Sequence, residues 1–330
     1  MSGVSWRDGC AREGGASLLA HAQTNGLTAD LGIGIIIIII IVMMPCMHSR
    51  SDLALGLPWK RFPKLTSYLG GFRRGELTIL TGPTGCGKTT FMSEFSLDLV
   101  EQGVNTMWGS FEIRNARLAR TMLTQLAGEN LEKNMERFEE VADLMETLPL
   151  HFMAFHGQQP LKKVMEAVEH ATYVHDLGHI VIDNVQFMLG VEQMEKRYMN
   201  RFHMQDVVID AFRNHATSTN CHVTLVMHPR KAYCPMKSLA ELAGDLLSIN
   251  SIYGSAKASQ DADNVLILQD HTSFPGGRRF IQVTKNRYNG ILGNMALIFD
   301  RDSMCYNKKK KGDPVKGVFE GDINVTKPNE

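Results

Sequence analysis

Residues 76–103, ELTILTGPTGCGKTTFMSEFSLDLVEQG, decide how this chain folds. The apolar run at 77–80 predicts a buried strand, and the segment that closes the stretch has helical periodicity. Between them lies a turn made of Gly82, Pro83, Thr84, Gly85, Cys86, Gly87, Lys88, Thr89 and Thr90. A strand, a glycine-rich turn and a helix in this order form the context that a phosphate-binding loop requires.

This loop predicts that the chain binds a nucleotide together with Mg²⁺. Its glycines let backbone N–H groups approach phosphate oxygens, and the following helix presents the positive end of its dipole. Lys88 is expected to reach the β- and γ-phosphates, and the Thr89 hydroxyl is expected to bind Mg²⁺. The alternative is a glycine-rich turn with a chance lysine, but every position and both flanks agree with the motif. We therefore predict ATP or another nucleoside triphosphate, and Mg²⁺, as ligands.

The composition is that of an ordinary globular protein. The 330 residues are 44% apolar, which is enough for a sizeable core in one large domain or two small ones. Lysine plus arginine and aspartate plus glutamate both number 35, so any polyanion must be bound by a local basic lining. The six cysteines are scattered without a CxxC pair, which favours a reducing compartment and argues against structural zinc.

The chain divides by composition into four parts. Residues 1–50 lack periodicity, are expected to be disordered and contain an isoleucine-rich apolar stretch of 14 residues. This is shorter than the roughly 18 residues of a membrane span, so none is expected, although an anchor, a mitochondrial presequence and a gene-model artefact stay open. Residues 51–75 form a lead-in or partial linker that could pack on the core or on a neighbouring subunit. Residues 76–306 form the main domain, and 307–330 a disordered polar tail.

Alternating strands and helices predict an α/β fold. After the first unit, strands are expected at 104–111, 150–155, 179–185 and 221–228, with helices at 115–127, 131–147, 161–175 and 201–219. Such alternation predicts a mostly parallel central sheet flanked by helices. Late strands at 264–269 and 279–285, joined by a turn at 274–277, predict an antiparallel hairpin, and 295–299 is expected to close the sheet.

Polar residues at strand ends are candidates for chemistry beside the phosphate loop, because the carboxyl ends of parallel strands meet at one edge. Asp183 could hold Mg²⁺ through water, and Glu112 could activate the attacking water or be an exposed turn residue. His228 could contact the γ-phosphate or be a strand-end histidine with other partners. Asn184, with Gln186 beside it, could orient the water or couple to a bound strand.

Lys285-Asn-Arg287 follows the predicted strand at 279–285. A guanidinium placed against the charge that develops on a transferred phosphoryl group accelerates its transfer. Arg287 could therefore serve the site of a neighbouring subunit if it faces away from its own phosphate loop. A surface arginine without a role is the alternative.

Several segments together resemble the helicase domain of the Twinkle family of mitochondrial replicative DNA helicases. This family belongs to helicase superfamily 4 and is similar to the helicase half of phage primase-helicases. The resemblance spans about residues 57–306. The segments that carry it are WKRFP (59–63), GPTGCGKTT (82–90), WGSFEI (108–113), FHGQQ (155–159), IDN (182–184), LVMHPRK (225–231), GSAKASQ (254–260) and KNR (285–287).

The resemblance implies a RecA-like phosphate-loop ATPase core that assembles into a homohexameric ring. The ring would hydrolyse nucleoside triphosphates at subunit interfaces, translocate 5′ to 3′ on single-stranded DNA and unwind forked DNA. It also implies the mitochondrial matrix nucleoid as the location, with the mitochondrial DNA polymerase and single-strand-binding protein as partners.

The same resemblance assigns roles to matching positions. Lys88, Thr89 and Asp183 would bind nucleotide and Mg²⁺, while Glu112 would activate water and His228 would sense the γ-phosphate. Gln260 would be the late polar contact between nucleotide and DNA loop, and Arg287, with Lys285 beside it, the arginine finger supplied in trans. Five residues would face single-stranded DNA in the central channel: Arg230, Lys231, Gly254, Ser255 and Lys257.

Three departures from the family pattern leave other functions open. A primase-like region is not expected in this chain, the inter-subunit linker is at best partial, and the segment at 232–249 is longer and more apolar than its acidic counterpart. A RecA-like recombination ATPase is one alternative. A nucleotide-binding fragment that cannot assemble is the other.

Overall fold

The computed structural model describes residues 56–189, 201–229, 246–252, 257–272 and 277–306. Among these residues, no helix has the length and apolar character needed to cross a membrane. The isoleucine-rich stretch, the expected turn at 274–277 and most of the segment at 232–249 lie outside the described residues.

An eight-stranded sheet forms the centre of the described fold, with the order β3-β2-β4-β5-β1-β6-β7-β8. The first six strands of that order run parallel, whereas β7 pairs antiparallel with β6 and with β8. This confirms the predicted α/β fold, with a mostly parallel sheet and a late antiparallel hairpin. The strands are β1 (Leu77–Thr81), β2 (Thr106–Ser110), β3 (Leu150–Phe152), β4 (His179–Asp183), β5 (His222–Met227), β6 (Asn264–Asp270), β7 (Arg279–Asn286) and β8 (Gly293–Leu297). A separate pair is formed by β9 (Phe299–Asp300) and β10 (Cys305–Tyr306).

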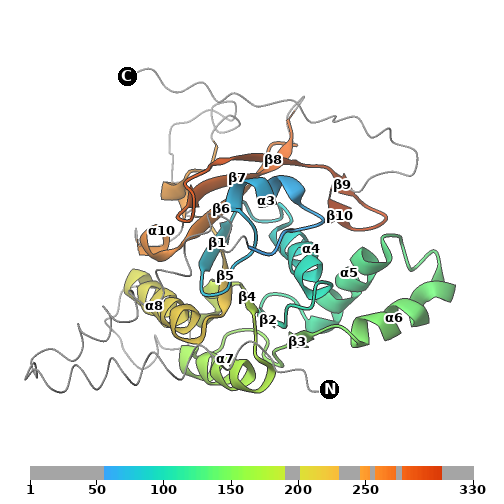
Figure 1. Cartoon of the computed structure of the whole chain (residues 1–330), viewed down its shortest axis with the longest axis horizontal. Coiled ribbons are helices and arrows are strands. Elements are labelled where there is room, and N and C mark those ends of the chain that lie inside the picture. The colour runs from blue at the N-terminus through green and yellow to red at the C-terminus, as the bar shows by residue number, and fades with distance from the viewer. Residues whose placement is uncertain (1–55, 190–200, 230–245, 253–256, 273–276, 307–330) are drawn as a thin grey trace, which may run out of the picture. The chain divides into compact units, whose positions relative to one another are not determined.

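Helices cover both faces of the sheet (Figure 1). The helices on one face are α3 (Pro63–Leu69), α4 (Lys88–Val100) and α5 (Asn115–Ala127), and α6 (Phe138–Glu146) lies beside α5. The helices on the other face are α7 (Leu161–His175), α8 (Arg201–Thr219) and the short α10 (Lys257–Asp261). Short 3-10 turns lie at Met135–Arg137, Val185–Met188 and Ile249–Ser251.

The central strands are apolar throughout because helices bury both of their faces. Ile180 and Ile182 of β4 point into the cluster that contains α7 and α8, whereas Val181 points into the cluster that contains α4. The strand ends are thereby fixed in a rigid frame, from which the loops that follow them emerge at one edge.

The lead-in segment packs on the core of its own chain. Trp59 and Phe62 are 2% and 1% exposed, and Trp59 lies 4.9 Å from the ring of Phe95 on α4. Leu57 forms a bridge with Phe72, so the segment closes on itself before it enters β1. Of the two packing possibilities left open by the sequence, the structure has the first for residues 57–72.

Two element boundaries differ from the sequence prediction. The helix expected at 131–147 begins only at Phe138, because tight turns at 130–134 place Leu131 in the interior at 5% exposure. The Asn130 side chain stabilises these turns by accepting a hydrogen bond from the Glu132 amide. Strand β7 continues through Asn286, so Lys285 lies within the strand and Arg287 directly after it.

Candidate functional site

The phosphate loop joins β1 to α4 as the sequence predicts. Gly85 and Gly87 have φ values of 79° and 98°, a region that only glycine adopts without strain. Lys88 is 7% exposed, and its Nζ donates to the carbonyl oxygens of Gly82 and Pro83 at 2.9 Å each. The ammonium group therefore lies against the loop, where it can reach a phosphate held by the loop amides.

Asp183 contacts the loop directly. The Thr89 hydroxyl donates to Asp183 Oδ2 at 2.6 Å, and Asp183 is 1% exposed. Burial, followed by the nearby Glu112 carboxylate, raises the pKa of Asp183 to about 6, although the Thr89 hydrogen bond opposes this rise. A hydroxyl and a carboxylate side by side are oxygen ligands of the kind that Mg²⁺ takes. Thr89 and Asp183 thus fit a Mg²⁺ site, and a cation there would favour the charged carboxylate.

Asn184 connects the two other predicted residues of this edge. Its Nδ2 donates to Glu112 Oε2 at 2.7 Å and lies 3.0 Å from His228 Nε2. Glu112 comes just after β2, which pairs with β4, and His228 directly follows β5 on the other side of β4. The parallel register of these three strands therefore brings together side chains that are 44 to 72 residues apart in the chain.

His228 is held as a neutral imidazole. Burial, then the positive charge of Lys88, lowers its pKa, while Glu112 at 3.8 Å opposes the shift. Because Nε2 accepts from the Asn184 amide, the proton of the neutral ring lies on Nδ1. That nitrogen is buried and has no hydrogen-bond partner among the described residues. It is a donor available to a ligand beside the loop.

The structure adds a support behind the loop that the sequence analysis did not identify. A Cβ at Gly87 would lie 2.6 Å from the Tyr306 hydroxyl, so only glycine fits there. Arg279 interacts with that hydroxyl, and its Nη2 donates to Asp270 Oδ2 at 2.5 Å. Asp270 and Arg279 face each other across β6 and β7. Opposite charges at the two ends of a predicted hairpin were the available signal for this pair, whereas Tyr306 carried none.

Gln260, Lys285 and Arg287 lie at the opposite edge of the sheet. The Arg287 amide donates to the carbonyl oxygen of Asp263, which precedes β6, and the Asp263 amide donates to the carbonyl oxygen of Leu77, where β1 begins. The five residues of β1 separate this edge from the phosphate loop, which is about 17 Å at 3.3 Å per residue. The structure therefore does not bring these three residues to the phosphate loop of their own chain.

The predicted DNA-facing residues are only partly described. Arg230, Lys231, Gly254 and Ser255 lie outside the described residues. Lys257 begins α10, where its Nζ donates to Asp210 Oδ2 of α8 at 2.6 Å. This contact ties the end of the predicted DNA segment to the helix that covers the sheet.

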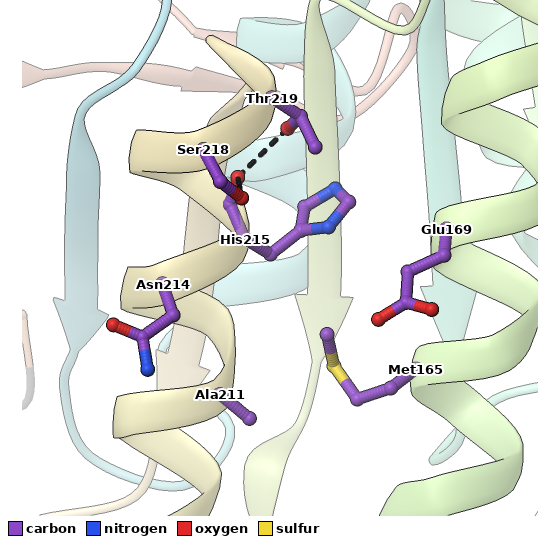
Figure 2. Close-up of a pocket in the computed structure, with 7 residues that line it drawn as sticks. All are labelled: Met165, Glu169, Ala211, Asn214, His215, Ser218 and Thr219. Atoms are coloured by element: carbon purple, nitrogen blue, oxygen red, sulfur yellow. Dashed lines mark hydrogen bonds between the residues drawn. The ribbon is translucent and has the colours of Figure 1, made fainter.

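A pocket of about 420 Å³ lies between α7 and α8 (Figure 2). The imidazole of His215 points from α8 toward α7, where Met165 and Glu169 face it. His215 Nε2 lies 3.2 Å from the Thr172 hydroxyl, and burial lowers the pKa of the ring. The residues that line this pocket are Met165, Glu169, Ala211, Asn214, His215, Ser218 and Thr219, none of which the sequence analysis had predicted as a site residue.

Two solved structures have the same fold as this chain. The first is the ATPase domain of a DnaB-like helicase, which matches with a TM-score of 0.66 at 13% identity, over 86% of this chain and 100% of that one. The second is a DnaB-like replicative helicase, whose structure was solved to show its interactions with primase, and it matches with a TM-score of 0.64 at 14% identity. That match covers 88% of this chain and 70% of the helicase. At these identities the likeness establishes the fold.

The sequence also matches a family model directly. The AAA domain model covers residues 46–233, which is more than half of the chain. The matched range includes the phosphate loop, Glu112, Asp183 and His228, which the fold gathers at one edge of the sheet. This chain belongs to the AAA domain family.

Proposed function

We propose that this chain is an ATP-dependent DNA helicase whose catalytic sites are each completed by a second copy. The observation that carries the proposal is the division of charged groups between the two sheet edges. Lys88, Asp183 and Glu112 lie at one edge, and Arg287 lies at the other. An arginine in that position cannot assist its own loop, but it can assist the loop of a neighbour in a head-to-tail ring.

Within the pocket, each residue has a chemical task. Glu112 accepts a proton from the attacking water, and Asn184 holds the Glu112 carboxylate in place. Lys88 and the loop amides neutralise the phosphates. His228 donates from Nδ1 when a γ-phosphate is present. Mg²⁺, held by Thr89 and Asp183, would supply positive charge at the phosphate oxygens.

The finer parts of the proposal derive from the motif resemblance. We propose a homohexameric ring of the Twinkle family that moves 5′ to 3′ on single-stranded DNA, in the mitochondrial nucleoid. Single-stranded and forked DNA would be its substrates, contacted by Arg230, Lys231, Gly254, Ser255 and Lys257. The mitochondrial DNA polymerase and single-strand-binding protein would be its partners. The similarity of the fold to a DnaB-like replicative helicase supports this class.

Mass and hydrolysis measured on one preparation test the proposal. With Mg²⁺ and ATP, we expect light scattering to report a ring, and single-stranded DNA to raise turnover several-fold. Forked substrates with a 5′ or a 3′ tail then report the direction of unwinding. A wild-type chain whose turnover is indifferent to DNA would contradict the proposed function.

The arginine finger is tested on the same assay. Arg287→Ala should assemble and bind ATP but lose turnover by about 10³-fold, the lower range for such fingers. Arg278→Ala is the matched control, because Arg278 is exposed, nine residues away and outside the site. Full turnover in Arg287→Ala would exclude a finger role.

A further inference from the structure

The guanidinium of Arg287 is oriented by its own chain. Its Nη1 donates to Asp263 Oδ1 at 3.1 Å, and its Nη2 donates to the Gln260 carbonyl oxygen at 2.6 Å. The side chain is nevertheless 52% exposed, so part of the guanidinium faces outward. Arg287 is thus held at two points without being enclosed.

Asp263 is the fixed point of this arrangement. The residue is 8% exposed, and its Oδ2 accepts from the Leu77 amide at 2.8 Å. The same oxygen accepts from Arg213 Nη1, and Arg213 Nη2 donates to the Gly75 carbonyl oxygen. The carboxylate is therefore anchored to the first residue of β1, the strand that leads into the phosphate loop.

The charges around Asp263 do not balance. One buried carboxylate faces two guanidinium groups, Arg213 at 24% side-chain exposure and Arg287 at 52%. Arg213 and the Leu77 amide already satisfy one oxygen and compensate the charge, so the fold does not need Arg287 for that purpose. The surplus positive charge lies on the more exposed group, which points to a ligand outside the chain.

The end of α10 belongs to the same frame. Lys285 Nζ donates to the carbonyl oxygens of Ser259 and Gln260 at 2.7 and 2.9 Å. The Gln260 carbonyl oxygen therefore accepts from both Lys285 and Arg287. Burial, then the adjacent Arg287, lowers the pKa of Lys285. The strand end that carries the finger is thus tied to the helix that follows the predicted DNA-facing segment.

We propose that Asp263 is a positioning residue that aims the Arg287 guanidinium at the triphosphate bound by a second copy of this chain. Asp263 does not touch that nucleotide. It fixes the rotamer of Arg287 relative to β1, so that little ordering remains to be done when the neighbour's phosphate arrives. The inference rests on the proposed function, since it presumes that hydrolysis takes place between copies.

Asp263→Asn tests the inference because it keeps the shape of the side chain and removes its charge. We expect turnover on single-stranded DNA to fall about tenfold or more, while the Kd for nucleotide and the mass of the assembly stay unchanged. Adding Arg287→Ala should cause no further loss beyond Arg287→Ala alone, because both changes remove one interaction. Turnover equal to that of the wild type, or losses that multiply, would overturn the inference.

Glu76→Gln is the matched control. Glu76 has 18% side-chain exposure against 12% for Asp263, lies at the same sheet edge and pairs with Arg73. It also accepts from Asn264, whereas the finger's own partners in the described part of the chain are Asp263 and Gln260. We expect the turnover of Glu76→Gln to stay within twofold of the wild type.

A second substitution carries the test if Asp263→Asn does not fold. Asp263→Glu keeps the charge but displaces the carboxylate by one methylene, so the guanidinium that it holds should shift with it. We expect a loss of turnover of at least about threefold, with unchanged assembly and unchanged nucleotide affinity. Wild-type turnover in Asp263→Glu would overturn the inference.

A mixing experiment separates this inference from the proposed function. Glu112→Gln subunits have an inactive pocket but an intact finger, whereas Asp263→Asn subunits have an intact pocket and a misplaced finger. Mixing the two should restore turnover, and mixing Asp263→Asn with Arg287→Ala should not. A wild-type chain without DNA-stimulated turnover overturns the proposed function and the inference together. An active wild type without complementation overturns the inference alone.

Discussion

The two edges of the central sheet hold charged side chains under opposite conditions. At the edge of the phosphate loop, Asp183 is buried with only a neutral hydroxyl as its direct partner among the described residues, and burial raises its pKa to about 6. At the other edge, the Asp263 carboxylate accepts from an amide and two guanidinium groups. One edge therefore lacks positive charge, and the other has a surplus.

This difference teaches how one fold can divide a reaction between two copies of itself. A buried carboxylate in need of a cation suits an edge that receives a metal and a phosphate. A fixed and partly exposed guanidinium suits an edge that delivers charge. Strand β1 joins them, since Leu77 contacts Asp263 and Thr81 leads into the loop. Each prediction below alters one edge and leaves the other intact.

The largest expected effect comes from Lys88→Ala at the receiving edge. Lys88 is the buried cation of the loop, and its loss removes the charge that neutralises the β- and γ-phosphates. We expect turnover to fall at least about 10²-fold and nucleotide affinity to fall with it. Nucleotide titration and turnover should be measured together, because Arg287→Ala at the delivering edge should lose turnover alone. Wild-type affinity in Lys88→Ala would break the comparison.

A smaller effect is expected from Asn184→Ala. The change removes the amide that holds Glu112 and fixes the His228 tautomer, so turnover should fall about 10- to 100-fold with little change in KM. Combined with His228→Ala, the losses should be less than multiplicative, since the two groups act through one contact. Asn214→Ala is the control, because Asn214 is exposed and lines the α7–α8 pocket. A KM effect as large as the turnover effect would assign Asn184 to nucleotide binding instead.

The receiving edge was largely predictable from the sequence, because its parts are local patterns. A glycine-rich loop between an apolar run and a periodic segment predicts its own structure. Strand-end residues such as Glu112 and His228 meet at one edge in any parallel sheet. Even the strand order was not needed to expect this, and the register of β2, β4 and β5 then brings Asn184 between them.

The delivering edge was not predictable in the same way. Asp263 carries no motif, and its partners Leu77 and Arg213 are 186 and 50 residues away in the chain. Tyr306 behind Gly87 is a contact of the same kind. The late start of α6 was missed because the apolar spacing at 131–147 fits a helix, while the turn that buries Leu131 depends on the hydrogen bond of Asn130. Contacts of this kind are decided by tertiary packing.

The smallest expected effect is on stability, and it concerns Asp183. Because burial raises the pKa of Asp183 from 3.8 to about 6, the folded chain binds this proton more tightly than the unfolded chain. The stabilising contribution of the protonated form is complete below pH 3.8 and is lost as pH rises through 6. Asp183→Asn should therefore unfold with a free energy about 1 to 3 kcal/mol higher than the wild type at about pH 7.5, and with no difference at about pH 3.5.

Urea unfolding at the two pH values measures this difference, and Mg²⁺ with nucleotide sharpens it. The ligands should stabilise the wild type, because they compensate the buried charge, and should stabilise Asp183→Asn much less. Asp176→Asn is the control: its side chain is 82% exposed beside Arg74, so its effect should stay below about 0.5 kcal/mol. A gain in stability together with lost hydrolysis would mean that the receiving edge sacrifices stability for its ligand site. Equal stability of Asp183→Asn and the wild type at the higher pH would instead mean that the carboxylate is already compensated without a metal, and the contrast between the edges would then lie in geometry and not in charge.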